Sequence, residues 1–153
     1  MHVQRLGHVV LKVRDVRRAE AFYAGVLGIP IVSRVAQPVC MTMFTLGDHH
    51  DFAVIELGDE ATSPAAQATG LAHVAFKIGD SIAEFRSAKT ELEATDVDII
   101  YEADRAFTKS MHVHDPDGNE VELYIDTSDA WRPPAPPRGC AVPDAREAED
   151  RQT

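Results

Sequence analysis

The feature that most constrains this chain is an internal repeat. The segment LGHVVLKVRD, at residues 6–15, returns as LAHVAFKIGD at residues 71–80, sixty-five positions later. A second pair of similar segments consists of VIEL, at residues 54–57, and EVEL, at residues 120–123. Two copies of one unit in a chain of 153 residues predict two similar modules related by a pseudo-twofold axis.

Each copy predicts the same order of elements. An alternating apolar strand comes first, and a helix follows that begins at Asp15 in one copy and at the capping box of Ser81 and Glu84 in the other. Gly28 ends the first helix. Further strands are expected at residues 31–36, 40–46 and 51–57, and then at 98–102, 108–114 and 120–125. The sequence therefore predicts an α+β fold of two βαβββ modules.

The predicted organisation is a single domain with four parts. Residues 1–58 form the first module, and the small-residue segment 59–70 forms a linker. Residues 71–131 form the second module. From residue 132 to residue 153 the composition is rich in proline and charge, which predicts a disordered tail.

Composition excludes several kinds of partner. A net charge of −10 argues against nucleic acid, because phosphate backbones are bound by clustered Lys and Arg. No apolar run approaches the length of a membrane span and the N-terminus lacks a signal-peptide layout, so we expect a cytoplasmic protein. Cys40 and Cys140 suggest neither a disulfide framework nor a cysteine metal site. A small-molecule partner remains.

Strand alternation predicts a cluster of polar side chains on the face of the sheets that carries no helix. On the strand at 51–57 we assign Ala53, Ile55 and Leu57 to the helix side, which leaves Glu56 opposite. The expected cluster consists of His8, His50, Glu56, His73, His112 and Glu122.

Within this cluster the two modules contribute matched pairs. His8 precedes Glu56 by 48 residues, and His73 precedes Glu122 by 49. A single histidine at the start of an apolar strand is usually structural, but two in the same module position are hard to ascribe to packing. Buried carboxylates are costly unless they are paired or bind a metal. We therefore predict a metal site with four candidate ligands, His8, His73, Glu56 and Glu122.

The chain resembles the vicinal-oxygen-chelate superfamily, which includes glyoxalase I, extradiol dioxygenases and bleomycin-resistance proteins. The resemblance covers about residues 4–131 and rests on LGHVVLKVRD, FYAGVLG, GLAHVAFKI and DPDGNEVELY. It implies an open half-barrel of two modules around one divalent metal, with ligands at His8, His73 and Glu122. Position 56 is the variable one.

Within this superfamily the chain is most similar to one-domain catechol 2,3-dioxygenase-like proteins, through DHHDFAVIEL and DPDGNEVELYID. That similarity implies Fe(II), with Mn(II), Ni(II) or Zn(II) as alternatives, and a catechol-like substrate that reacts with O2. It also implies an acid-base histidine at His50 or, less closely, His49. The chain departs from the group because Arg105 replaces a His and His112 replaces a Tyr. His112 is therefore a candidate substitute acid-base group or a structural imidazole.

Two other functions stay open at this point. In a glyoxalase I-like lyase or isomerase, Glu56 would be a fourth metal ligand and two positions on the metal would remain open. A bleomycin-resistance-type binding protein would hold a small molecule in the same cavity without a metal. We expect a homodimer, whose modules pair either within one chain or between two.

Overall fold

The structure is a computed structural model that describes residues 1–65 and 67–132. The first module contains β1 (Val9–Val13), α1 (Val16–Glu20), η1 (Ala21–Val26), β2 (Ile31–Val35), β3 (Met41–Phe44) and β4 (Phe52–Glu56). The second contains β5 (Val74–Gly79), α2 (Ile82–Glu93), β6 (Ile99–Asp104), β7 (Thr108–His114) and β8 (Glu120–Asp126). The predicted α+β fold of two βαβββ modules is confirmed. The predicted tail, except Arg132, lies outside the described residues.

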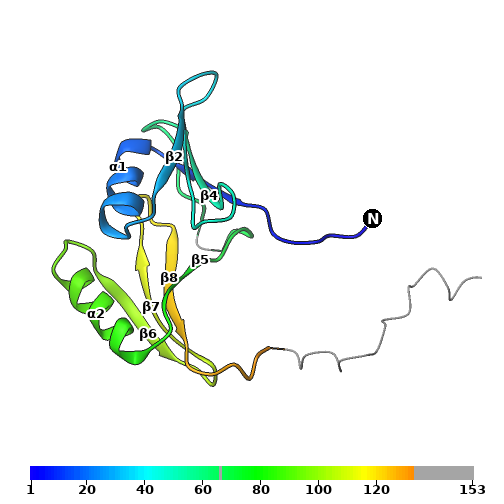
Figure 1. Ribbon diagram of the computed structural model, residues 1–153. Coiled ribbons are helices and arrows are strands. Elements are labelled where there is room, and N and C mark those ends of the chain that lie inside the picture. Colours follow the sequence, from blue (N-terminus) through cyan, green and yellow to red (C-terminus); the bar gives the residue numbers. More distant parts are fainter. Residues whose placement is uncertain (66, 133–153) are drawn as a thin grey trace, which may run out of the picture.

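Each module forms its own four-stranded mixed sheet. The strand order is β1-β4-β3-β2 in the first sheet and β5-β8-β7-β6 in the second. In each sheet the first and last strands of the module run parallel, and the other neighbours are antiparallel. Figure 1 shows α1 and α2 on one side of the molecule, while the N-terminal segment leaves on the other. Neither sheet closes on itself, as expected for an open half-barrel.

The first helix begins where the sequence predicts. The side chain of Asp15 accepts hydrogen bonds from the backbone N–H groups of Arg17 and Arg18, at 2.6 and 3.3 Å, and so caps α1. The helix then continues as the π-helical segment η1. It stops before Gly28, whose φ of +70° is a conformation that favours glycine.

Local sequence also determines the start of α2 and the last hairpin. Ser81 Oγ accepts from the Glu84 N–H at 3.2 Å, which is half of the predicted capping box. In the turn between β7 and β8, Asp115 Oδ1 accepts from the N–H groups of Asp117 and Asn119, both at 2.9 Å. These bonds fix the DPDGN segment as a tight connection. In the described part of the chain, no helix has the length and apolar content to cross a membrane.

One hydrophobic core joins the two modules. The ring of Tyr23, from η1, lies 4.6 Å from that of Phe52 on β4 and 6.4 Å from that of Phe76 on β5. The Tyr23 hydroxyl donates to Asp115 Oδ2 at 3.0 Å, so the last hairpin is attached to the first helix. Burial, and then the Asp115 charge, raise the pKa of Tyr23 well above its usual range. The two modules therefore pack as one unit.

The predicted orientation of β4 is wrong. Phe52 contacts Tyr23, and Glu56 Oε2 accepts a hydrogen bond from the Val16 N–H at 3.0 Å, so both side chains face the helix. Phe52 and Ala53 are each only 1% exposed. Because both faces of β4 are apolar, the alternation of its sequence did not distinguish them. Tertiary packing placed the larger Phe52 ring against the helix.

Candidate metal centre

The second module brings together two of the predicted ligands, His73 and Glu122. His73 stands just before β5, and Glu122 lies on the neighbouring strand β8. Nε2 of His73 is 3.1 Å from Oε2 of Glu122, and their side chains are 39% and 15% exposed. An imidazole and a carboxylate, still reachable from solvent, are two of the three donors found in a metal site with two histidines and one carboxylate.

Next to this pair lies a hydrogen-bonded group centred on the buried His112. The His112 side chain is 1% exposed, and its Nδ1 is 2.8 Å from Glu120 Oε1. The Tyr101 hydroxyl donates to the same oxygen at 2.9 Å, and its ring stacks on the imidazole with centroids 4.2 Å apart. Because a carboxylate only accepts hydrogen bonds, Nδ1 carries a proton. On the other side of the ring, Nε2 of His112 is 3.4 Å from Ser110 Oγ and 3.6 Å from Glu122 Oε1.

The pKa shifts of Glu120 and Tyr101 agree with these hydrogen bonds. Partial burial would raise the pKa of Glu120, but the hydrogen bonds from Tyr101 and His112 outweigh it and lower the pKa. The same hydrogen bond to Glu120 raises the pKa of Tyr101. Sequence reasoning identified His112 but gave no role to Tyr101 or Glu120. The available signal was that Glu120 precedes Glu122 by two residues and so shares its strand face.

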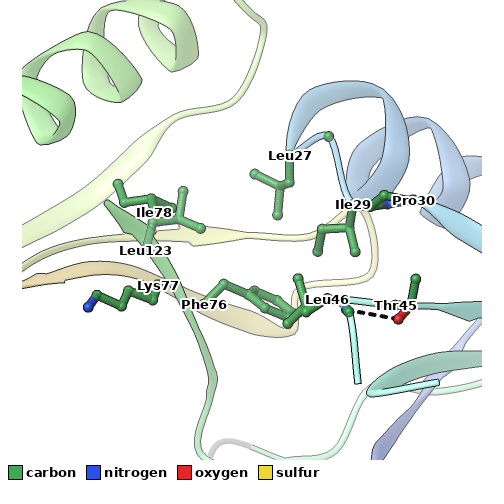
Figure 2. Close-up of a pocket in the computed structure, with 11 residues that line it drawn as sticks. Leu27, Ile29, Pro30, Thr45, Leu46, Phe76, Lys77, Ile78 and Leu123 are labelled. Carbon is green, nitrogen blue, oxygen red and sulfur yellow. Dashed lines mark hydrogen bonds between the residues drawn. The ribbon is translucent and has the colours of Figure 1, made fainter. Parts of the chain in front are cut away.

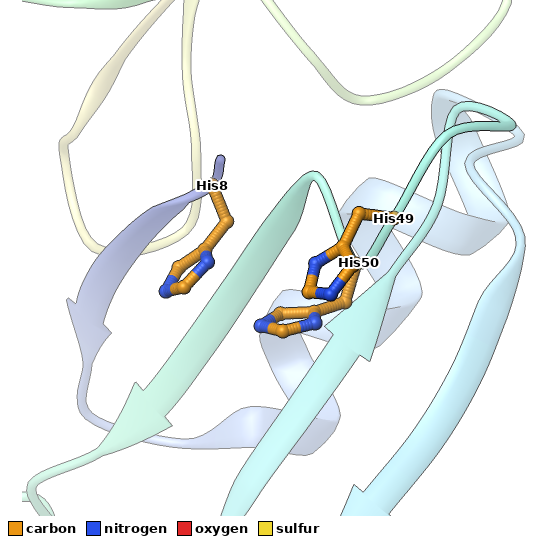
Figure 3. A group of neighbouring side chains, drawn as sticks. All are labelled: His8, His49 and His50. Atoms are coloured by element: carbon orange, nitrogen blue, oxygen red, sulfur yellow. The ribbon is translucent and has the colours of Figure 1, made fainter. Parts of the chain in front are cut away.

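The first module gathers three histidines, His8, His49 and His50 (Figure 3). Each offers a ring nitrogen that lies within 4.8 Å of the other two. The ring centroids of His8 and His50 are 4.4 Å apart, and those of His49 and His50 are 4.1 Å apart. A backbone hydrogen bond of 3.1 Å from the Val9 N–H to the Asp51 carbonyl holds the two segments together.

The environment of His50 disfavours the protonated form of its ring. Partial burial lowers its pKa below the usual range, and the neighbouring rings of His49 and His8 lower it further. Asp51 opposes these effects. The carboxylate of Asp51 is already engaged, since it accepts from the Leu46 N–H at 2.7 Å.

Glu56 does not lie with the other predicted ligands. In the parallel pairing of β1 with β4, Val10 is opposite Ala53, whereas in the pairing of β5 with β8, Ala75 is opposite Glu122. Val10 and Ala75 each follow a module's histidine by two residues. Ala53 is therefore the structural counterpart of Glu122, and the first module places a methyl group where the second places a carboxylate.

The predicted ligands form two separate groups within one chain. His73 and Glu122 are together, and His8 lies with His49 and His50. Across residues 1–65 and 67–132, the three-histidine cluster is the only group of three or more His, Cys, Asp or Glu side chains with ligand atoms within 4.8 Å of one another. The chain by itself therefore does not assemble His8, His73 and Glu122 around one point.

A further feature is a cavity of about 410 Å³ (Figure 2). Its apolar walls come from both modules, and the lining includes Leu27, Ile29, Leu46, Phe76, Ile78 and Leu123. None of the predicted site residues lines it. This cavity therefore lies between the two modules.

Comparison with known proteins agrees with this architecture. The family model for the Glyoxalase/Bleomycin resistance protein/Dioxygenase superfamily matches residues 5–123, and the chain belongs to this superfamily. The recognition made from the sequence motifs is thereby confirmed.

Two named relatives are dioxygenases. The chain is 31% identical to biphenyl-2,3-diol 1,2-dioxygenase 3 of Rhodococcus globerulus over 126 residues, which cover 80% of this chain and 63% of that protein. It is 26% identical to catechol-2,3-dioxygenase of Bacillus subtilis (strain 168), over 79% of this chain and 41% of that protein. This chain thus spans less than two thirds of either relative.

A solved structure with the same fold is that of lactoylglutathione lyase from Agrobacterium tumefaciens. The TM-score is 0.63 at 24% identity, over 80% of this chain and 94% of that chain. This likeness establishes the fold.

Proposed function

We propose that the protein is a metal-dependent extradiol-type ring-cleaving dioxygenase that acts on a small catechol-like substrate. The observation that carries this proposal is the strand register: the residue of the first module that corresponds to Glu122 is Ala53, which has no carboxylate. With Glu56 turned to the helix, the donor set is His8, His73 and Glu122. A three-ligand site supports a dioxygenase better than a four-ligand lyase, because three positions of an octahedral ion stay open.

The donors fit Fe(II). Two neutral imidazoles and one carboxylate on one face are the usual ligands of non-haem iron that reacts with O2. When bound there, Fe(II) would supply the Lewis-acid and redox chemistry that joins O2 to a ring with adjacent hydroxyl groups. Both oxygen atoms enter the ring-opened product in such a cleavage, so no further reductant is needed.

We propose that two copies of the chain complete each site. His8 of one copy would lie beside His73 and Glu122 of the other, since one chain keeps the two half-sites apart. Two identical sites would then be related by a twofold axis, which is the commonest symmetry of small oligomers.

The remaining side chains divide the other tasks. We assign His50 as the acid-base group that takes a substrate hydroxyl proton, because its ring lies beside that of His8, with centroids 4.4 Å apart, and its surroundings disfavour the protonated form. The ring centroid of His49 lies 4.1 Å from that of His50, and we assign His49 to hold the His50 ring in place. His112 suits a positioning role, because its side chain is buried and its Nδ1 is held by Glu120.

A direct test is to load the apo-protein with Fe(II) under anaerobic conditions and then add O2 with a panel of substituted catechols. We expect O2 uptake and a yellow ring-fission product, and we expect both to be lost in H73A and E122A. The matched control is His2→Ala, which removes an exposed histidine outside the site. Absence of uptake with every catechol would refute the proposal.

A mixing experiment tests the two-copy site. H8A and H73A are each expected to be inactive, but each mixed dimer contains one site with all its ligands. After random exchange of subunits, about a quarter of wild-type activity should return. No recovery, with exchange verified by tagged subunits, would show that each site is built within one chain.

A further inference from the structure

The three histidines of the first module exceed what the proposed iron site needs. His8 is one of its ligands and His50 its acid-base group, yet the nitrogens of His8, His49 and His50 lie within 4.8 Å of one another. We propose that this cluster is a second, nitrogen-only binding site for divalent ions that prefer imidazole, such as Zn²⁺, which shares His8 with the iron site, so that an ion bound there withdraws His8 from the iron.

The geometry needs only small side-chain movements to bind such an ion. Imidazole nitrogens around a tetrahedral Zn²⁺ lie roughly 3.3 Å apart, given Zn–N bonds of about 2.0 Å. His8 and His49 are exposed, and His50 is partly buried, so the two outer rings can rotate toward the inner one. Figure 3 shows the three rings side by side on neighbouring segments, with His8 and His49 stacked and both tilted relative to His50. The Val9-to-Asp51 hydrogen bond fixes the backbone beneath them.

The donor chemistry selects the ion. The nearest carboxylates in sequence are already paired, Asp48 with the Arg5 guanidinium and Asp51 with the Leu46 N–H. The cluster itself consists of imidazoles alone. Imidazole suits Zn²⁺, Cu²⁺ and Ni²⁺, whereas Mg²⁺ and Ca²⁺ need oxygen ligands. A fourth position would remain for water.

The cluster is specific to the first module. Ala53 corresponds to Glu122 by register, so the positions that correspond to His49 and His50 are Gly118 and Asn119. Neither residue offers an imidazole, and Asn119 is bonded to Asp115 through both its backbone N–H and its side chain. The duplicated metal-ligand pattern therefore does not explain the histidines at 49 and 50.

The consequence for activity rests on the proposed function. Both sites need the His8 ring, so filling the three-histidine cluster with Zn²⁺ would empty a ligand position of the iron site. Zinc would then inhibit the enzyme in proportion to its occupancy of the cluster.

The binding site itself is tested without reference to activity. In the H73A/E122A double variant the ligands of the second module are absent, and Zn²⁺ is titrated against a chromogenic chelator. We expect one Zn²⁺ per chain, and at least a tenfold loss of affinity when His49→Asn and His50→Asn are added. His2→Ala in the same background is the matched control and should leave the affinity unchanged. Far-UV circular dichroism confirms that each variant is folded.

The outcomes separate the two proposals. If H73A/E122A binds Zn²⁺ no more tightly than the variant that also carries His49→Asn and His50→Asn, the cluster site is overturned, whether or not the enzyme is active. Tight, His49-dependent binding without any dioxygenase activity would support the cluster and refute the proposed function. In an active enzyme, Zn²⁺ inhibition of the Fe(II) form should weaken in His49→Asn, with each variant measured relative to its own rate without zinc; equal inhibition in both would overturn the link through His8.

Discussion

Replacement of Glu56 separates a helix-capping role from a metal-binding role. Its Oε2 accepts the Val16 N–H at 3.0 Å at the start of α1, and Val16 is only 5% exposed. In E56A this amide would lose its acceptor in a place that water reaches poorly. Unsatisfied buried groups cost about 1–3 kcal/mol, and lost helix caps about 0.5–2 kcal/mol. We therefore expect E56A to lower the free energy of unfolding by about 1–2 kcal/mol.

The stability assay is reversible urea unfolding followed by circular dichroism. With a typical slope of about 2 kcal/mol per molar urea, the midpoint of E56A should fall by roughly 0.5–1 M. E56Q keeps an oxygen that can accept from Val16 and loses only a charge near the helix N-terminus. The free energy of unfolding of E56Q should therefore fall by less, roughly 0.3–1 kcal/mol.

Metal binding then decides between the two roles. Because Glu56 faces the helix, E56Q should bind Fe(II) with wild-type stoichiometry, measured by elemental analysis after desalting. E122Q is the matched comparison and should lose the ion bound with His73. If E56Q loses metal as completely as E122Q while its stability is unchanged, the assignment of Glu56 as a cap is wrong, and the four-ligand lyase becomes the better reading.

Three further predictions concern stability and the buried side chains. Y23F removes a hydrogen bond to the Asp115 carboxylate. It should lower the free energy of unfolding in urea by about 1.5–3 kcal/mol, the usual value for hydrogen bonds to charged groups. A loss below about 0.5 kcal/mol would contradict a direct link between the modules through this bond. The hydrogen bond from Arg34 lowers the pKa of Glu20. The ionised Glu20 therefore stabilises the fold above the ordinary glutamate pKa, and this stabilisation is lost as the pH falls through the folded-state pKa. The difference in melting temperature between wild type and E20Q should narrow below about pH 4, and a difference that stays constant with pH would exclude this linkage. Glu120→Gln should lower kcat more than it raises KM, because Nε2 of the imidazole that Glu120 holds lies 3.6 Å from Glu122, the proposed metal ligand. An unchanged kcat would show that this orientation has no catalytic effect.

The sequence by itself determined the two-module architecture. The repeat specified two βαβββ units, and local caps at Asp15 and Ser81 set where each helix begins, because both signals depend on residues close together in the chain. The motifs also identified the superfamily. His73 and Glu122 were predicted to share a face, and they do, because Glu120, Glu122 and Tyr124 alternate with apolar residues on β8.

Only the tertiary structure decided how β4 faces and which residues meet. Phe52, Ala53 and Val54 are all buried, so alternation carried no information there, and the register with β1 was needed to show that Ala53 corresponds to Glu122. The contacts of His112 with Tyr101 and Glu120 join three strands, and the cluster of His8 with His49 and His50 joins segments about forty residues apart. Such contacts depend on strand pairing and packing between distant segments, which the local pattern of side chains does not specify.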